Sequence, residues 1–222
     1  MWVLRVAVQT MPEAIITLHQ WLSPAFPVGG FSYSHGIETA VAVQMITDAA
    51  LARDWIETAL VHGAGQSDAI LLAAAWRSLP DDLGELIGLA RALAPSSERL
   101  LESDRMGASF ARIVRDLHGI DLRDAPYPVA FGCAARLMDF PLNLTLDLFV
   151  QAFVANLVSA AVRLVPLGQT EGQRITLSLA PMIQKVAHNA RQGDVDQIAN
   201  TAVRIDLASM QHETLTTRLF QS

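Results

Sequence analysis

The stretch Leu148–Val162, LFVQAFVANLVSAAV, indicates most clearly which class of fold this chain adopts. It is a long apolar run that three polar residues interrupt, namely Gln151, Asn156 and Ser159. A membrane-spanning helix needs about 20 consecutive, predominantly apolar residues. We therefore predict a helix buried in a protein core, which begins at Asn143 or Thr145 and ends at Val165.

The segments on either side of this run are rich in the strong helix formers Ala, Leu, Glu, Gln, Arg and Met. Capping residues and prolines set the expected ends of the other helices. We predict helices at 13–22, 36–44, 48–63, 67–78, 81–94, 95–118, 128–139 and 170–192. A last helix, capped by Asp194, is expected to run into the tail. Only Trp2–Val8 alternates weakly, as a strand would.

The sequence contains no internal repeat, low-complexity run or linker. It therefore predicts one all-α domain of about ten helices over residues 1–222. Within that domain we expect an N-terminal arm at 1–12 and a partner-binding tail at 205–222.

The composition favours a protein that binds other proteins. Hydrophobic residues make up 51% of the chain, and charged residues make up 17%, below the usual share of about 25%. Surplus apolar surface commonly marks a protein–protein contact, although an ordinary helical protein rich in Ala and Leu has the same composition. The net charge is −6 and Lys185 is the single lysine. We therefore expect no binding to nucleic acid or to anionic membranes.

The single cysteine, Cys133, can form no disulfide within the chain, which fits a reducing compartment. Residues Met1–Thr10 lack the long apolar run and the cleavage site of a secretory signal. We therefore expect a cytoplasmic protein.

Catalytic and metal-binding motifs are not evident in the sequence. It contains no Walker P-loop, no G-x-G-x-x-G motif and no G-x-S-x-G elbow. His212-Glu213-Thr214 lacks the second histidine of an H-E-x-x-H motif. No two of the six histidines are four positions apart, so local sequence predicts no dedicated metal site. We expect no catalytic residue and no bound cofactor. An enzyme with dispersed catalytic residues remains an alternative.

Four stretches resemble the UreF family of urease accessory proteins. The first is Ser23–Glu38, SPAFPVGGFSYSHGIE, which is close to the family pattern S-P-x-x-P-V-G-x-F-S-Y-S-x-G-[LI]-E. The second is Glu98–Gly107, in which Ser103, Met106 and Gly107 fit the family and Glu102, Asp104 and Arg105 depart from it. The third is Pro126–Gly132, where a proline replaces the usual histidine. The fourth is Asn156–Gln173, together with Asp206–Glu213 and Thr216–Phe220 of the tail.

This resemblance implies a UreF-like helical bundle that tends to dimerise. It implies binding to a UreD-type partner (also called UreH), then to the nickel-carrying GTPase UreG, and docking of this assembly on apo-urease. GTP hydrolysis would be coupled to nickel insertion, and nickel would pass through transiently. An open alternative is a nickel-carrying metallochaperone with its own metal site. A nickel route past Asn156 or Ser159 is less favoured than close packing of helices there.

The candidate partner-binding residues come from these stretches: Pro27, Phe31, Tyr33, Ser103, Met106, Gln169, Gln173, Asp206, Met210, His212, Glu213, Arg218 and Phe220. Residues 23–36 are predicted to form an ordered loop, here called the first loop, whose aromatic side chains can anchor a partner or fill the core. In the tail, a terminal helix with Met, Leu and Phe on one side would suit a groove on a partner. The alternative is that the tail folds back on its own core.

Overall fold

The computed structural model describes residues 10–78 and 83–222. Its α-helices are α1 (Met11–Leu22), α2 (Ile37–Ala42), α3 (Ala49–His62), α4 (Ala64–Arg77), α5 (Leu83–Ala92), α6 (Ser97–His118), α7 (Tyr127–Leu137), α8 (Leu142–Leu164), α9 (Gln169–Ala190) and α10 (Val203–His212). No β-strand occurs in these two ranges, so the all-α prediction is confirmed. The weakly strand-like Trp2–Val8 lies outside the described residues. Of the proposed arm at 1–12, residues 11 and 12 begin α1.

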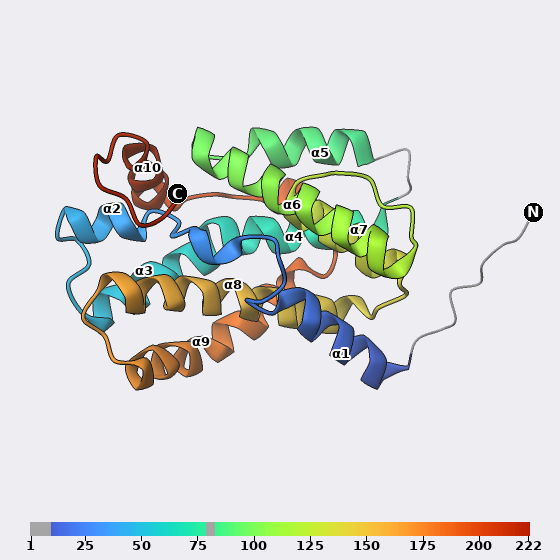
Figure 1. Ribbon diagram of the computed structural model, residues 1–222, viewed down its shortest axis with the longest axis horizontal. Helices are drawn as coiled ribbons and strands as arrows, with labels where there is room; N and C mark the ends of the chain where they lie inside the picture. The colour runs from blue at the N-terminus through green and yellow to red at the C-terminus, as the bar shows by residue number, and fades with distance from the viewer. Residues whose placement is uncertain (1–9, 79–82) are drawn as a thin grey trace, which may run out of the picture.

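Helix α4 lies at the centre of the fold and contacts α3, α5, α7, α8 and α9. In Figure 1 it runs between α5 and α6 on one side and α8 and α9 on the other. Residues 69–75 of α4 are all buried, and four of these seven are alanine. Small side chains let neighbouring helices approach on every face. The alanine-rich sequence of α4 therefore explains why five helices can pack around it.

Two glycines mark the closest approaches in the fold. A Cβ atom added to Gly132 of α7 would lie 2.2 Å from the carbonyl oxygen of Leu72 in α4. A Cβ atom added to Gly107 of α6 would lie 1.9 Å from the carbonyl oxygen of Ala125, just before α7. Only glycine fits where backbones are this close. These two positions fix α7 against both α4 and α6.

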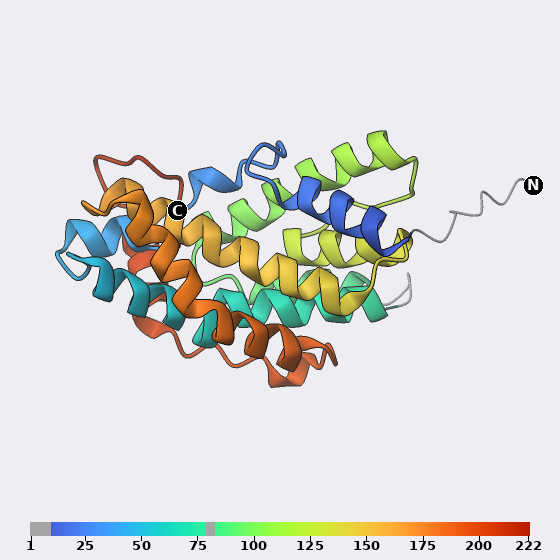
Figure 2. The ribbon, with the colours of Figure 1, turned by 90° about the horizontal axis from the view of Figure 1, so that it is seen from below.

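The long helix α8 matches the predicted apolar helix, but it is only partly enclosed. Half of its most apolar 18-residue window is buried, and the helix packs against α9, α4, α3 and α1. Figure 2 shows α8 lying alongside α9 and α1. It is the one described helix that is long and apolar enough to cross a membrane, a property that core helices share. Helix α8 also packs against α2 and α7, and its contacts with these six helices account for its apolar character.

An aromatic cluster fills the core under α1. Trp21 is fully buried, and its ring centre lies 5.3 Å from that of Phe110, 5.6 Å from that of Phe131 and 5.3 Å from that of Phe140. The Trp21 indole N–H donates a hydrogen bond to His118 Nε2 at 3.3 Å. The cluster joins α1 to α6, α7 and the start of α8.

Several predicted helix starts agree with the capping geometry. Asp48 caps α3 by accepting from the Leu51 N–H at 2.9 Å, and Ser96 caps α6 by accepting from the Arg99 N–H at 3.2 Å. The start of α4 was predicted wrongly at residue 67. Gly63 both ends α3 and precedes α4, and the Ser67 hydroxyl bonds back to the Gly63 carbonyl from inside the helix.

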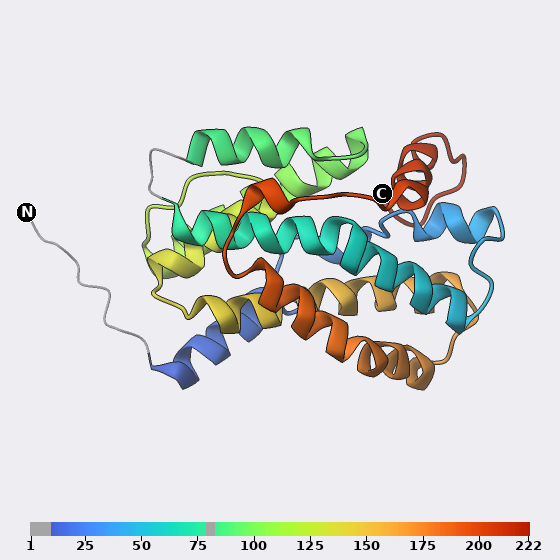
Figure 3. The ribbon, with the colours of Figure 1, turned by 180° about the vertical axis from the view of Figure 1, so that it is seen from behind.

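The prediction that Asp194 caps a long last helix is wrong. Asp194 instead caps a 3₁₀ turn at Val195–Gln197, and an irregular segment follows up to Ala202. This connecting segment runs back along α4, as Figure 3 shows. At one end, a Cβ atom added to Gly193 would collide with the backbone of Ala73 and Ala74. At the other end, the Thr201 N–H donates to the His62 carbonyl at 2.9 Å. The segment delivers α10 to the opposite end of α4.

Candidate partner-binding surface

The tail, residues 213–222, folds back on its own protein and is not helical. The predicted terminal helix therefore ends at His212. The Gln221 N–H donates to the Ser32 carbonyl at 2.7 Å. Both the N–H and the hydroxyl of Ser34 donate to the Ser222 backbone oxygen, at 2.8 and 2.6 Å. The tail thus pairs with the first loop through its backbone.

Phe220 anchors the tail in the core, since only 4% of its surface is exposed. The Arg163 guanidinium lies over its ring at 4.4 Å, a distance typical of a cation–π contact. The same guanidinium donates to the Phe31 carbonyl at 3.0 Å. Arg163 therefore connects α8, the first loop and the tail.

A second anchor, here called the His212 junction, consists of His212, Glu38, Glu98 and Arg218. His212 is fully buried, with Nδ1 at 2.6 Å from Glu98 Oε2 and Nε2 at 3.0 Å from Glu38 Oε2. Arg218 donates to Glu98 Oε1 at 2.6 Å. The backbone N–H groups of Leu219 and Phe220 donate to Glu38 at 2.7 and 3.0 Å. The junction ties α10 and the tail to α2 and α6.

Further along α6, a buried polar cluster lies beneath the end of the tail. Arg99 forms an ion pair with Glu102 and donates to His35 Nε2 at 3.0 Å. Burial alone would raise the pKa of Glu102, but Arg99 and His35 outweigh it and lower that pKa to about 2. Burial lowers the pKa of His35, with a further contribution from Arg99, although Glu102 opposes the shift. The Ser222 hydroxyl donates to Glu102 at 2.7 Å, which links the tail to the cluster.

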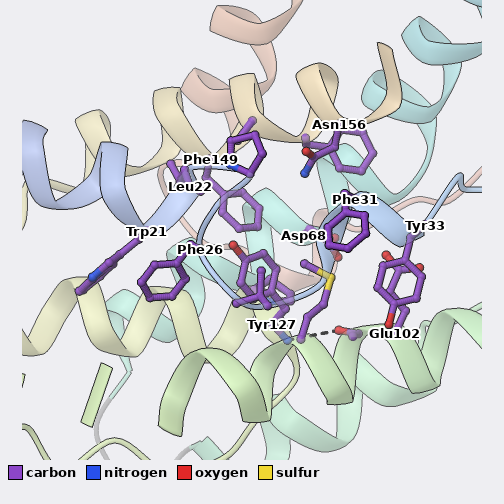
Figure 4. Close-up of a pocket in the computed structure, with 18 of the residues that line it drawn as sticks. Trp21, Leu22, Phe26, Phe31, Tyr33, Asp68, Glu102, Tyr127, Phe149 and Asn156 are labelled. Carbon is purple, nitrogen blue, oxygen red and sulfur yellow. Dashed lines mark hydrogen bonds between the residues drawn. The ribbon is translucent and has the colours of Figure 1, made fainter. Parts of the chain in front are cut away.

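Two small cavities lie on either side of this cluster and share His35, Asp68, Arg99 and Ser103 in their walls. The larger has a volume of about 70 Å³, and seven of its 21 lining residues are Phe, Tyr or Trp. Figure 4 shows Asp68 among these side chains. The second has a volume of about 50 Å³ and lies toward Asp206 and α10. Burial, together with Glu102, raises the pKa of Asp68 to about 6 although Arg99 opposes the shift.

The predicted site residues fall into three groups by exposure. Seven have exposed side chains: Pro27, Phe31, Gln169, Gln173, Met210, Glu213 and Arg218. Four are buried: Tyr33, Met106, His212 and Phe220. Ser103 and Asp206 are intermediate. Most of the first-loop and tail residues lie close together, whereas Gln169 and Gln173 lie at the start of α9.

The aromatic side chains of the first loop divide between the two expected roles, filling the core and remaining exposed to a partner. Phe26 and Tyr33 are buried, while Phe31 is 62% exposed. Gly29 has φ of +80°, a left-handed conformation that favours glycine. Gly36, at φ of +76°, precedes α2, and a Cβ atom there would lie 3.0 Å from Cβ of Ala208 in α10. These glycines shape the loop and let α10 approach it.

Helix α10 exposes a row of large apolar side chains, here called the α10 stripe. Val203, Leu207 and Met210 are 61%, 50% and 48% exposed. Their spacing of four and three residues places them on one side of the helix. The opposite side of α10 packs on α2 and α6 through Ile205, Ala208 and Ser209. Leu219, in the tail, is 67% exposed as well.

Sequence reasoning missed the charged residues that hold the tail in place: Glu38 and Arg99, which are buried, Glu98, which is partly buried, and Arg163, which is exposed. Glu38 and His212 are 174 residues apart, so no local pattern connects them. A usable signal was the spacing of Glu98 and Glu102, which puts two carboxylates on one face of a helix. In a chain with few charged residues, two acidic residues on the same face would have indicated that this face of α6 binds charged partners.

The described residues show no metal-binding cluster. No group of three or more His, Cys, Asp or Glu side chains within 10–78 and 83–222 could hold a metal ion. Burial raises the pKa of the Cys133 thiol to about 11, so this cysteine stays protonated at neutral pH. These residues therefore offer neither a preformed ligand set nor a reactive thiolate.

Comparison with known proteins places most of the chain among urease accessory proteins. The sequence model of the UreF family matches residues 46–180. UreF of Cereibacter sphaeroides is 51% identical over 212 residues, which cover 96% of this chain and 100% of that protein. UreF of Roseobacter denitrificans is 47% identical over 210 residues, which cover 95% of each chain. UreF of Bradyrhizobium diazoefficiens is 44% identical, over 94% of this chain and 92% of its own.

Proposed function

This chain belongs to the UreF family of urease accessory proteins, and on that premise we propose that it is a scaffold for urease maturation. It binds a UreD/UreH-type accessory protein and recruits and regulates a UreG-type GTPase. The assembly then delivers nickel to apo-urease. The scaffold itself performs no catalytic step.

The observation that carries this proposal is the α10 stripe. Three large apolar side chains on one face of a short helix are costly to leave in water. Because the opposite face of α10 is already buried against α2 and α6, the stripe can be covered only from outside. An apolar row at helical spacing suits a groove on another protein. We assign the stripe, together with the exposed Leu219 of the tail, to the UreD/UreH-type partner.

The tail supports this role because it is held in one conformation. Its backbone pairs with the first loop, and Glu38 fixes the N–H groups of Leu219 and Phe220. A preorganised surface loses little conformational entropy when a partner binds. Arg218, whose side chain is 40% exposed, keeps donor groups available at the edge of this surface.

The remaining features of the scaffold are proposed on the family premise. We expect it to work in the cytoplasm as a homodimer within the complex, with nickel passing through transiently. The polar turn at the start of α9, with Gln169 and Gln173 exposed, is our candidate contact for the UreG-type GTPase.

The test is to compare Leu207→Glu with Leu177→Glu in the full chain. Leu177 is a matched control because it is 75% exposed on α9 and lies outside the α10 stripe. A charge buried at the centre of an interface typically reduces affinity at least about tenfold. We expect Leu207→Glu to lose co-purification with the UreD/UreH-type protein, and Leu177→Glu to retain it. Circular dichroism checks that both variants keep their helices.

Full co-purification of Leu207→Glu would refute the assignment of the stripe. Two further measurements separate a scaffold from its alternatives. The purified chain should turn over neither GTP nor urea. In equilibrium dialysis it should bind nickel only weakly, because a tight stoichiometric site would instead favour a metallochaperone.

A further inference from the structure

The His212 junction is balanced in charge only when its histidine is protonated. Glu38 and Glu98 each carry one negative charge, and Arg218 carries one positive charge. An imidazolium at His212 brings the sum to zero. Because His212 is fully buried and Glu38 is nearly so, an imbalance of one charge here would be poorly screened by water.

The hydrogen bonds of His212 require the same protonation state. Each ring nitrogen faces a carboxylate oxygen, Nδ1 that of Glu98 at 2.6 Å and Nε2 that of Glu38 at 3.0 Å. An ionised carboxylate only accepts hydrogen bonds, so both nitrogens must donate. A neutral imidazole has one N–H, and its other nitrogen would point a lone pair at a carboxylate. The geometry fits the imidazolium.

Within residues 10–78 and 83–222, no other nearby group can take over this role. The charged groups that face His212 from the packed elements are Glu38 of α2, Glu98 of α6 and Arg218 of the tail. Arg218 pairs with Glu98 and not with Glu38. In the junction, the cationic partner of Glu38 is therefore His212. Arg99, the next residue of α6, pairs with Glu102 in the separate cluster with His35. Loss of the proton therefore leaves Glu38 uncompensated.

Glu38 is also the acceptor that fixes the tail, through the Leu219 and Phe220 N–H groups. A weakened contact between His212 and Glu38 separates α10 from α2 at the point where the tail is held. We propose that His212 is a pH-sensitive latch: its protonated ring holds α10 and the tail on the protein, and its deprotonation loosens them. Docking takes up a proton, so it weakens as the pH rises.

The latch can be tested on the isolated full chain by amide hydrogen exchange, detected by NMR, between about pH 6 and pH 9. Exchange rates are divided by the intrinsic rate at each pH, which gives a protection factor. We expect the protection factors of Leu219 and Phe220 to fall at least about tenfold as the pH rises, while α4 keeps its protection. The fall should coincide with the titration of the His212 ring signals.

The variants are His212→Gln and, as a matched control, His188→Gln. His188 is an exposed histidine in the last turn of α9. The control should behave as the wild type, whereas His212→Gln should show weak tail protection that no longer depends on pH. Constant tail protection in the wild type would overturn the latch, as would an unchanged pH dependence in His212→Gln. If His212→Gln does not fold, the wild type decides alone: tail signals that change at a different pH from the His212 ring refute it.

Discussion

Replacing Glu38 by Gln should release the tail without unfolding the protein. Glu38 Oε1 accepts from the Leu219 N–H at 2.7 Å, while Oε2 accepts from the Phe220 N–H and from His212, both at 3.0 Å. Glutamine keeps the shape but offers one acceptor oxygen and one NH₂ donor. The arrangement that saves most contacts turns the NH₂ toward Leu219, where two donors then face each other.

The cost follows from these contacts. One hydrogen bond to a charged acceptor is lost, which is worth about 1.5–3 kcal/mol. The bond from the Phe220 N–H becomes neutral, and the bond from His212 keeps a charged donor but loses its charged acceptor; both are weakened, since charge-assisted bonds are roughly twice as strong. We expect a total of about 2–4 kcal/mol, confined to tail docking. By the relation of about 1.4 kcal/mol per factor of ten, exchange of the tail amides should accelerate about 30- to 1,000-fold.

The assay is hydrogen exchange with mass spectrometry on peptides that cover residues 213–222, together with urea unfolding of the whole chain. The matched control is Glu57→Gln, since Glu57 pairs with Arg53 at 2.8 Å on the surface of α3. Surface ion pairs contribute about 0–1 kcal/mol. If Glu38→Gln changes tail exchange by less than about threefold, or no more than the control does, Glu38 does not hold the tail.

Two other predictions concern the core. Gly107→Ala should lower the free energy of unfolding by about 1–3 kcal/mol or more, because the added methyl group would overlap the Ala125 carbonyl. Urea titration measures this loss. The control is Gly88→Ala, which should be neutral or stabilising because Gly88 has open space around it. Acid should destabilise the fold through His118. Its ring accepts a hydrogen bond from the Trp21 indole N–H, and burial lowers its pKa. The unfolded chain therefore takes up the proton first, so stability present above about pH 6.5 is lost as the pH falls below it. Urea unfolding at about pH 7.5 and pH 5 should show this loss, and an equal loss in His118→Gln would contradict it.

Much of the helical layout could be predicted because its signals are local. Asp48 and Ser96 each cap a helix with a hydrogen bond to the N–H three residues later, close to the helix starts predicted at residues 48 and 95. The apolar composition of α8 was a similar local signal. The error at α4 came from the same kind of evidence, because Ser67 resembles a capping residue but lies inside the helix.

The end of the last helix and the buried charges could not be predicted in this way. Thr214, Thr216 and Thr217 are weak helix formers, and they were the available sign that α10 stops at His212. The partners of His212 come from α2 and α6, at separations of 174 and 114 residues. Only the folded chain brings them together, so the sequence showed His212 as part of an incomplete zinc motif and as a candidate partner-binding residue, without its buried carboxylate partners.

The close approach at Gly132 also limits how the molecule can deform. Where α7 meets α4, glycine and alanine leave the backbones almost in contact, so no long side chain can change rotamer to let one helix slide past the other. These two helices should therefore move as a rigid unit. A docking protein can apply strain at the end of α4 that lies near His62. We expect α10 and its connecting segment to absorb that strain, so induced fit should be sought there.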